Sequence, residues 1–214
     1  MLLNYYGDLH NDILEDGTYE TQVCLDEVNR GGLFGNVFVC ATIWNPILQD
    51  PTGQMEKIKD SKKLTKKKRL ELRQYIENNA IDHVVCSIDN NTIDKINILQ
   101  STFKAMHECL DIITKRHNVD RILVDGNMFP TYKMIPHVCI PKGDNTYIGI
   151  ACSSILAKCN HDDWIENMCN QNNELDEKYS LLSNRGYGTK KHIEGIKQFG
   201  LTTYHRKSFC KNFT

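Results

Sequence analysis

The order of apolar segments along the chain constrains the fold more than any other feature of the sequence. Two apolar, β-branched segments come first, and later ones alternate with stretches of helical periodicity. An early pair of strands followed by alternating helices and strands predicts an α/β fold with a central mixed β-sheet flanked by helices. The expected strands cover residues 22–26, 36–44, 83–89, 121–125 and, with a weaker pattern, 135–140.

Apolar residues three or four positions apart indicate where the helices lie. The clearest pattern predicts one long amphipathic helix across 92–115, and a second helix is expected at 65–78. A third helix is expected to begin after Asp144, which is a candidate cap for it. A short helix is expected at 190–198, directly before Gly200.

The size and composition of the chain fit one globular unit. It has 214 residues, of which 40% are hydrophobic and 25% are charged. The first twenty residues lack the pattern of a signal peptide, and the longest apolar stretch, near Val37 to Trp44, is too short to span a bilayer. Nine cysteines without a CxxC pair are expected to be reduced core residues. We therefore expect a soluble, cytoplasmic monomer with no membrane partner.

Charge is distributed unevenly, although the net charge is only -1. Residues 1–20 carry five acidic side chains and no Lys or Arg. The segment 57–73 has nine basic residues against two acidic ones, and 185–211 has seven against one. Such basic clusters are the electrostatic footprint of a partner with a phosphate backbone, although a solvated helix face has the same composition.

The same patterns suggest how the chain is divided. Residues 1–20 are expected to form an acidic N-terminal arm, and 21–214 a single domain. The Asn-rich stretch 167–184 is expected to be a flexible connection, so that a small helical C-terminal segment, from about 170 to 214, packs as an appendage.

Acidic side chains normally stay in water, so the informative ones are those at positions patterned for burial. Asp26 and Glu27 close the first expected strand, and Asp125 ends the apolar strand in "RILVDG". In "IACSSILAKCNHDDW", Asp162 continues the apolar stripe of a helix, whereas Asp163 is turned about 100° away from it. One carboxylate of this helix is therefore expected to point at the sheet.

Carboxylates gathered in a partly buried site repel one another unless a cation compensates their charge. Oxygen ligands without nearby His or Cys suit Mg²⁺ or Mn²⁺ better than Zn²⁺. If the three places converge, four carboxylates can hold two ions roughly 4 Å apart, which is the arrangement used in phosphodiester cleavage. The simpler interpretation of any single strand-end Asp is a turn cap.

Seven fragments together resemble the type 2 ribonucleases H, the ribonuclease HII family. They occur in the family's order over about 22–210, and each is weak alone. The fragments are "LDEVNRGGLFGNV", "DSKKLTKKKR", "IDKINIL" with "KAM", "ILVDGN", "PKGDNTYIGIACSSILAKCNHD", "RGYGTKKH" and "HRKSF".

This resemblance implies a ribonuclease H-like fold and an endoribonuclease that acts on RNA/DNA hybrids or on ribonucleotides embedded in duplex DNA. It implies two divalent ions, Mg²⁺ or Mn²⁺, as cofactors, and cleavage 5′ of a ribonucleotide that leaves 3′-hydroxyl and 5′-phosphate ends. By motif position, the catalytic and metal-binding carboxylates would be Asp26, Glu27, Asp125 and Asp162.

The resemblance also assigns the residues that contact the substrate. A Gly-Arg-Gly turn of the family approaches the 2′-hydroxyl through its backbone, and its positions here are Asn29, Arg30 and Gly31. Tyr187 of "GYGT" resembles the family's sensor of the sugar at a ribonucleotide junction. The expected contacts with the phosphate backbone are Lys62, Lys63, Asn97, Lys142 and Arg206.

Two departures from the family pattern fall on the turn. Asn29 replaces the first glycine, and Asn tolerates positive φ better than most residues, so the backbone shape is expected to survive. Gly32 stands where the family commonly has proline, which predicts a looser turn. Separately, "QFGLTTYH" at 198–205 partly fits the pattern of a sliding-clamp ligand, which would add a clamp as a partner.

Three alternatives compete with an active type 2 ribonuclease H. The chain could be a catalytically silent nucleic-acid-binding subunit, another two-metal nuclease of the same superfold such as a junction resolvase, or a structural α/β domain whose acidic residues are caps. Retention of all four candidate carboxylates argues against the silent subunit, and the joint presence of "DSKKL", "GYGT" and "HRKSF" argues against the resolvase.

Overall fold

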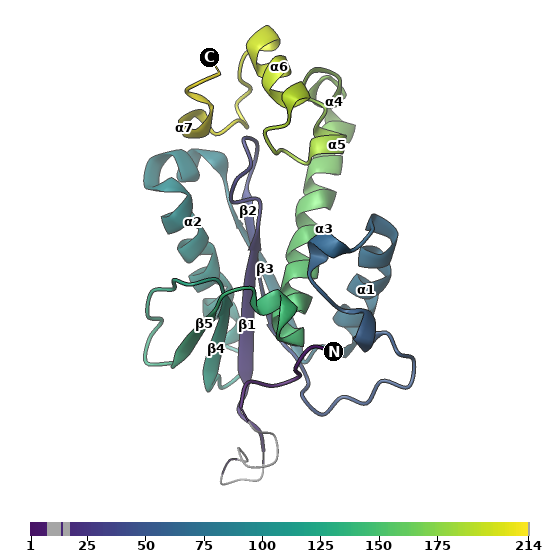
Figure 1. Cartoon of the computed structure of the whole chain (residues 1–214). Coiled ribbons are helices and arrows are strands. Elements are labelled where there is room, and N and C mark those ends of the chain that lie inside the picture. Colours follow the sequence, from purple (N-terminus) through teal and green to yellow (C-terminus); the bar gives the residue numbers. More distant parts are fainter. Residues whose placement is uncertain (8–13, 15–17, 214) are drawn as a thin grey trace.

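The computed structural model describes residues 1–7, 14 and 18–213, so nine of the twenty residues of the expected acidic arm, with four of its five acidic side chains, lie outside the described residues. Its centre is a five-stranded mixed sheet in the order β3-β2-β1-β4-β5 (Figure 1). The first three strands are antiparallel, whereas β1, β4 and β5 run parallel. All five expected strands and the α/β fold class are confirmed. The bounds are β1 Gln22–Val28, β2 Val37–Ile43, β3 Asp82–Ile88, β4 Arg121–Asp125 and β5 His137–Ile140.

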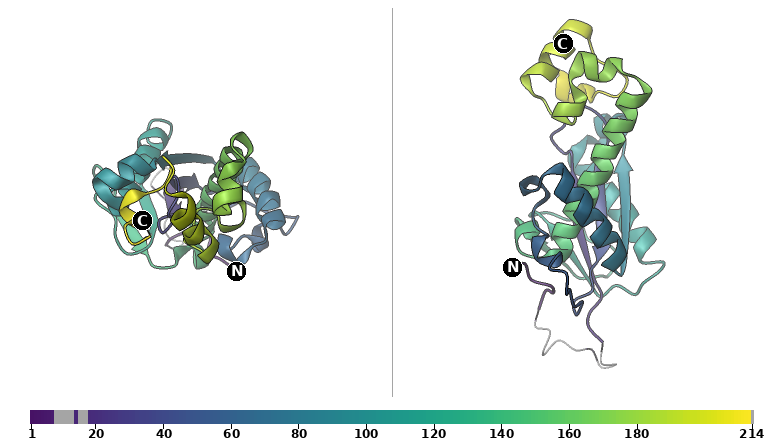
Figure 2. Two further views of the ribbon diagram at one scale, coloured as in Figure 1. Left: turned by 90° about the horizontal axis from the view of Figure 1, so that it is seen from above. Right: turned by 90° about the vertical axis from the view of Figure 1, so that its right-hand side faces the viewer.

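Helices cover both faces of the sheet, as the views from above and from the side show (Figure 2). α3, Ile148–Gln171, packs across β1 and β2 on one face, and α1, Lys66–Asn79, lies beside it. α2, Asn90–Ile113, packs on β2 and β3 from the other face. The two strands β1 and β2 are therefore buried on both sides, which explains the continuous apolar run of β2.

Alternation along β1 decides which side chains face which helix. Val23 and Leu25 belong to the core that α2 closes, whereas Cys24 packs with Ile150 of α3. Because successive side chains of a strand point to opposite faces, Asp26 is directed toward α3. Near its C-terminal end, β1 therefore places the carboxylate of Asp26 on the face of the sheet that α3 covers.

Two helix predictions need correction. The helix expected after Asp144 begins at Ile148, and Asp144 lies in the preceding 3₁₀ turn η3, Gly143–Asn145, without capping it. The helix expected to be continuous across 92–115 is interrupted at Asn97, which has φ 65° and ψ 168°. Apolar periodicity passes through such a break unchanged, because it reports the buried face and not the backbone angles.

The Asn-rich stretch is helical, so the expectation of a flexible connection was wrong. α3 runs on to Gln171, and short helices follow that gather at the end of the molecule opposite the N-terminus (Figure 1). A small core of their own, including Leu175, Tyr179 and Ile196, joins them to Leu33 and Phe34 of the turn after β1. The remaining elements are α4 Glu174–Tyr179, α5 Leu181–Asn184, α6 Lys190–Phe199, α7 Lys207–Cys210, and the 3₁₀ turns η1 Met55–Lys57 and η2 Ser61–Lys63.

The cysteines and helices agree with the compositional expectations. All nine cysteines are free thiols, and burial raises the pKa of Cys24 to about 12, which keeps it protonated. None of the helices in the described part of the chain is long and apolar enough to cross a membrane.

Candidate active site

Three of the four expected carboxylates meet at the ends of the two central strands. β1 and β4 are parallel neighbours, and their register pairs Leu25 with Val124, so Asp26 and Asp125 follow side by side. Glu27 comes next on β1. Asp26 is 5% exposed and is hydrogen-bonded to Ser154 of α3. The parallel pairing explains why residues almost a hundred positions apart form one acidic cluster.

Negative charge exceeds positive charge in this cluster, even with Arg30 and Lys62 beside it. Burial and the neighbouring charges of Glu27 and Asp125 raise the pKa of Asp26 well above its ordinary value. Burial also raises the pKa of Glu27, against the opposing effect of Arg30, whose guanidinium lies 3.2 Å from it. A cation would relieve this repulsion, so the carboxylates are arranged to bind one.

Asp144 is a fourth member of the cluster, which the sequence interpretation missed. It is 6% exposed, and burial together with Asp60 and Asp125 raises its pKa. The backbone N–H of its neighbour Gly143 donates to Oδ1 of Asp125 at 2.6 Å. A signal was present in the sequence, because Asp144 lies four residues after the end of β5, as Asp125 ends the neighbouring β4. The interpretation of Asp144 as a helix cap concealed this signal.

Asp162 lies elsewhere, which corrects the expectation that it completes the cluster. It is eight residues beyond Ser154 on α3, roughly 12 Å along the helix axis. Its oxygens contact Lys158 Nζ at 2.8 Å and Arg69 Nη2 at 3.3 Å. Burial acts to raise its pKa, but the hydrogen bond with His161 and the charge of Lys158 lower it to about 2. Asp162 is thus already neutralised by protein groups.

The predicted orientation of this helix was nevertheless right. Asp162 is 5% exposed, and Asp163 is turned outward into an ion pair with Arg73. Through Arg69, the buried carboxylate acts on another motif: Arg69 Nη1 donates to the carbonyls of Ser61 at 3.3 Å and Leu64 at 2.7 Å. Asp162 therefore fixes the arginine that holds the "DSKKL" turn.

Lys62, in that turn, is a second cation beside the acidic cluster, in addition to Arg30. Burial acts to lower its pKa, but Asp26, Asp60 and Asp144 together raise it. Its neighbour Lys63 is exposed and donates to the side-chain oxygen of Asn145. Both lysines therefore lie beside the candidate metal site, as expected for residues that contact a polyanion near it.

The donor set fits a hard divalent cation. It consists of the carboxylates of Asp26, Glu27, Asp125 and Asp144, and oxygen ligands of this kind suit Mg²⁺ and Mn²⁺. Among the described residues, no three His, Cys, Asp or Glu side chains already surround a common point as metal ligands.

The turn after β1 is built around Asn29. This residue has φ 70° and is 1% exposed, and its Nδ2 donates to the carbonyls of Phe34 at 3.0 Å and Asn36 at 2.9 Å. A Cβ at Gly32 would lie 1.8 Å from Asn29 Oδ1. The expectation that Gly32 loosens the turn was therefore wrong. The asparagine side chain fills the space above that glycine, and its hydrogen bonds hold the turn together.

The exposed part of the turn faces the groups expected to act with it. Arg30 and Gly31 are exposed, and Gly31 has no atom within 4 Å of a Cβ built on it. Tyr187 forms a bridge with Gly32, and its hydroxyl is hydrogen-bonded to the backbone N–H of Asn29. The "GYG" motif therefore contacts the turn, although the two are more than 150 residues apart in the sequence.

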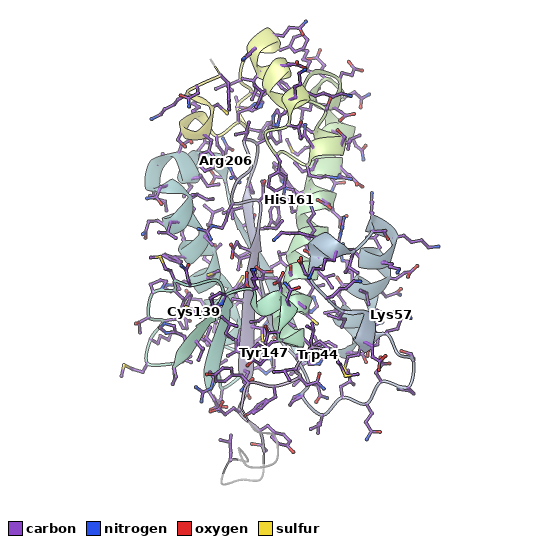
Figure 3. All side chains as sticks on the ribbon, viewed as in Figure 1. Trp44, Lys57, Cys139, Tyr147, His161 and Arg206 are labelled. Atoms are coloured by element: carbon purple, nitrogen blue, oxygen red, sulfur yellow. The ribbon has the colours of Figure 1, made fainter. Side chains whose placement is uncertain are left out.

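Arg206 has a different place from the one expected. It is fully buried, so it is not available as a contact with phosphate. Its Nε donates to the carbonyl of Gly35 at 2.9 Å and its Nη1 to that of Arg30 at 3.1 Å. Figure 3 shows it where the C-terminal segment meets the sheet. Arg206 therefore supports the turn through hydrogen bonds to its backbone carbonyls.

The two remaining expected contacts, Asn97 and Lys142, are exposed and both have positive φ. Oδ1 of Asn97 accepts from the N–H of Gln100, so it caps the helix that restarts there. Lys142 precedes Asp144 by two residues, so its backbone lies at the rim of the acidic cluster. Their role as contacts with a phosphate backbone remains a prediction.

A mixed sheet with carboxylates at the ends of adjacent central strands, flanked by helices, defines a ribonuclease H-like protein. A chain of the PCNA:RNase HII complex from Archaeoglobus fulgidus matches with a TM-score of 0.68 at 20% identity, over 90% of this chain and 96% of its own. Bst-RNase HIII in complex with Mn²⁺ matches with a TM-score of 0.61 at 18% identity, over 85% of this chain and 63% of its own.

Sequence comparison then identifies the particular family. The family model for ribonuclease HII matches residues 23–212. The ribonuclease HII of Parabacteroides distasonis is 42% identical over 187 residues, which are 86% of this chain and 87% of the relative. The chain belongs to the ribonuclease HII family and is an endoribonuclease. The alternatives of a junction resolvase and of a purely structural domain are thereby excluded.

Proposed function

We propose that this chain hydrolyses the RNA strand of RNA/DNA hybrids and cuts 5′ of ribonucleotides embedded in duplex DNA, leaving 3′-hydroxyl and 5′-phosphate ends. The observation that carries the proposal is the buried acidic cluster in which burial and the neighbouring carboxylates raise the pKa of Asp26. Such a cluster is stable in its ionised form only with a cation, and phosphodiester hydrolysis is the chemistry that two such ions serve.

The residues that hold the ions in this proposal are Asp26, Glu27, Asp125 and Asp144. Asp144 takes the place first expected for Asp162, because Asp162 is already paired with Lys158 and Arg69. When bound, Mg²⁺ or Mn²⁺ lowers the pKa of a coordinated water and stabilises the leaving oxygen. The four carboxylates would fix the position of the ions, with Asp26 the member of the cluster that feels both Glu27 and Asp125.

Substrate recognition is assigned to the rim of this site. The backbone of Asn29, Arg30 and Gly31 approaches the 2′-hydroxyl, and the ring of Tyr187 packs against the neighbouring sugar. Arg206 shapes this surface from inside and makes no contact with the nucleic acid. The phosphate backbone is contacted by Lys62, Lys63, Asn97 and Lys142, so binding should weaken steeply as salt is raised.

A sliding clamp is a secondary candidate partner. Phe199 and Tyr204, within the clamp-like segment 198–205, are 47% and 40% exposed. The same segment also supports the turn, because the carbonyl of Tyr204 accepts from the N–H of Gly35. A clamp that reshaped this segment would disturb the active site, so we propose nucleic acid as the primary partner. Cytoplasmic location, a monomeric state and roles in primer removal and ribonucleotide repair complete the proposal.

The proposal is tested with two labelled substrates, a DNA duplex with one embedded ribonucleotide and an all-RNA strand paired with DNA. With Mg²⁺ or Mn²⁺, the chain should cut both and leave 5′-phosphate ends. Asp125→Asn and Asp144→Asn should each bind the duplex normally and cut several orders of magnitude more slowly, because a lost metal ligand acts on the transition state. Binding without cleavage by the unmodified chain would instead support the silent subunit.

A further inference from the structure

Two fully buried histidines lie side by side next to the proposed junction sensor, and the chemistry above uses neither. His192 lies on α6, and His205 lies in the segment before α7. Their Nε2 atoms are 3.1 Å apart, and their ring centroids are 5.3 Å apart. Two imidazoles in this arrangement share one hydrogen bond, so the position of each proton matters.

Backbone groups fix the tautomer of both rings. The N–H of Thr202 donates to Nδ1 of His205 at 2.9 Å, so that nitrogen has no proton and the ring is protonated at Nε2. Thr202 Oγ1, 2.8 Å from the same nitrogen, accepts from the N–H of Tyr204 and donates its own proton to Nδ1. At the other end, the carbonyl of Tyr187 lies 3.0 Å from Nδ1 of His192 and can only accept, so this nitrogen is protonated. One assignment is left for the contact between the rings: His205 Nε2–H donates to His192 Nε2.

The surroundings keep both rings neutral. Burial lowers the pKa of His192, and burial with the proximity of His192 lowers that of His205 to about 3. The titratable group of α4 that packs on both rings is Tyr179, whose hydroxyl donates to the carbonyl of Gly200 at 2.9 Å. A further proton would place two N–H groups against each other at 3.1 Å, so the hydrogen bonds keep a single direction.

The chain of hydrogen bonds ends on the backbone of Tyr187. That residue also bridges to Gly32, and the N–H of Leu33 donates to the carbonyl of Gly186 at 2.8 Å. Backbone contacts thus join the turn to the tyrosine, and His192 adds a hydrogen bond to the tyrosine carbonyl. The carbonyl of Tyr187 also accepts from the N–H of Thr189 at 2.8 Å, and the N–H of Tyr187 donates to the carbonyl of Asn184 at 3.0 Å. His192 therefore adds a side-chain donor to a peptide that backbone hydrogen bonds also hold.

We propose that His192 and His205 form a one-directional hydrogen-bond relay from Thr202 to the carbonyl of Tyr187, and that this relay positions Tyr187 for discrimination of the ribonucleotide junction. The second part rests on the proposed function, because it needs Tyr187 to contact the sugar. Both histidines are positioning residues, since neither touches the reacting atoms.

The first test is ring ¹⁵N NMR of the unmodified chain at neutral pH. It should find His192 protonated at Nδ1, the rarer tautomer, and His205 protonated at Nε2. The opposite assignment, or a charged ring, would overturn the relay. This measurement requires no variant and no activity, so it remains decisive even if the chain cuts neither substrate and the proposed function fails.

The second test uses a matched pair of variants. In His192→Asn the amide N–H replaces Nδ1–H and still reaches the Tyr187 carbonyl. The longer amide of His192→Gln instead reaches the position of Nε2 and leaves the carbonyl with the backbone N–H of Thr189 as donor and no side-chain donor. The readout is kcat/KM on the single-ribonucleotide duplex divided by kcat/KM on the all-RNA hybrid. The ratio should stay within about twofold in the Asn variant and fall about three- to tenfold in the Gln variant, as expected for one hydrogen bond.

A general loss of stability would lower both rates alike and would not separate the two variants. Equal ratios in the Gln variant and the unmodified chain would therefore refute the positioning role, even with the tautomers as expected. If neither His192 variant folds, His205→Gln provides the same comparison, because it keeps a donor toward His192 and loses the acceptor for Thr202. An unchanged ratio there would refute the role as well.

Discussion

The substitution Asp162→Asn distinguishes two possible roles of Asp162, that of a metal ligand and that of a residue that stabilises the fold. In the folded chain the pKa of Asp162 is lowered from its ordinary 3.8 to about 2. Since a tenfold change in proton affinity is worth about 1.4 kcal/mol, the ionised carboxylate contributes about 2 kcal/mol to the free energy of unfolding at neutral pH. For a chain of this size, such a loss lowers Tm by about 5 °C. The substitution also leaves Lys158 and Arg69 without their partner.

The sign of the pH dependence follows from the lowered pKa. A carboxylate whose pKa is lower in the folded state stabilises the fold above about pH 4, and this contribution disappears as pH falls toward 2. Urea unfolding of the unmodified chain and of Asp162→Asn should therefore differ most at pH 7 and converge in acid. The neighbouring Asp163→Asn is the control, because its ion pair with Arg73 is half-exposed and worth at most about 0.5 kcal/mol.

Activity measured well below both values of Tm completes the comparison. Asp162→Asn should keep kcat within about tenfold and raise KM a few-fold, because Arg69 holds the turn that carries Lys62 less firmly. The metal concentration for half-maximal rate should not change. A loss of several orders of magnitude in kcat with unchanged stability would refute this reasoning and return Asp162 to the metal site.

Three further predictions concern the cluster and the turn. Without divalent ions, the raised pKa of Asp26 should make the chain less stable as pH rises above the ordinary Asp pKa of 3.8, and Mg²⁺ should restore the urea midpoint at neutral pH. A midpoint independent of pH and Mg²⁺ would contradict this. Arg206→Lys, which cannot bridge two carbonyls, should cost about 2 kcal/mol in urea unfolding, and a cost below 0.5 would exclude a supporting role. Gly32→Ala should destabilise by about 2 kcal/mol and recover in an Asn29→Gly background, whereas additive effects would show that the two do not collide.

The sequence was sufficient for the elements and for part of the site. Alternation and apolar runs predicted all five strands, because a strand buried on both faces leaves a strong compositional signal. Strand-end carboxylates predicted Asp26, Glu27 and Asp125, since polar residues stand out at the end of a buried run. Helical spacing also predicted correctly that Asp162 is buried and Asp163 is not.

Spacing could not predict where along its helix a buried residue meets the sheet. Asp162 and Ser154 lie on the same side of α3, yet only Ser154 reaches Asp26. Periodicity gives the angle of a side chain about the helix axis, whereas position along the axis depends on how the helix packs. In the packed structure Asp162 forms ion pairs with Lys158 and Arg69. The segment after β5 places Asp144 in the acidic cluster instead.

The sequence by itself therefore determined the α/β order of elements, the family and the three strand-end carboxylates, because these depend on local pattern and motif. Only the tertiary structure decided that Asp144 joins the cluster, that Arg206 is buried beneath the turn, and that Asn29 fills the space above Gly32. Each of these depends on contacts between segments distant in sequence or on a backbone angle. Neither residue type nor spacing encodes such contacts directly.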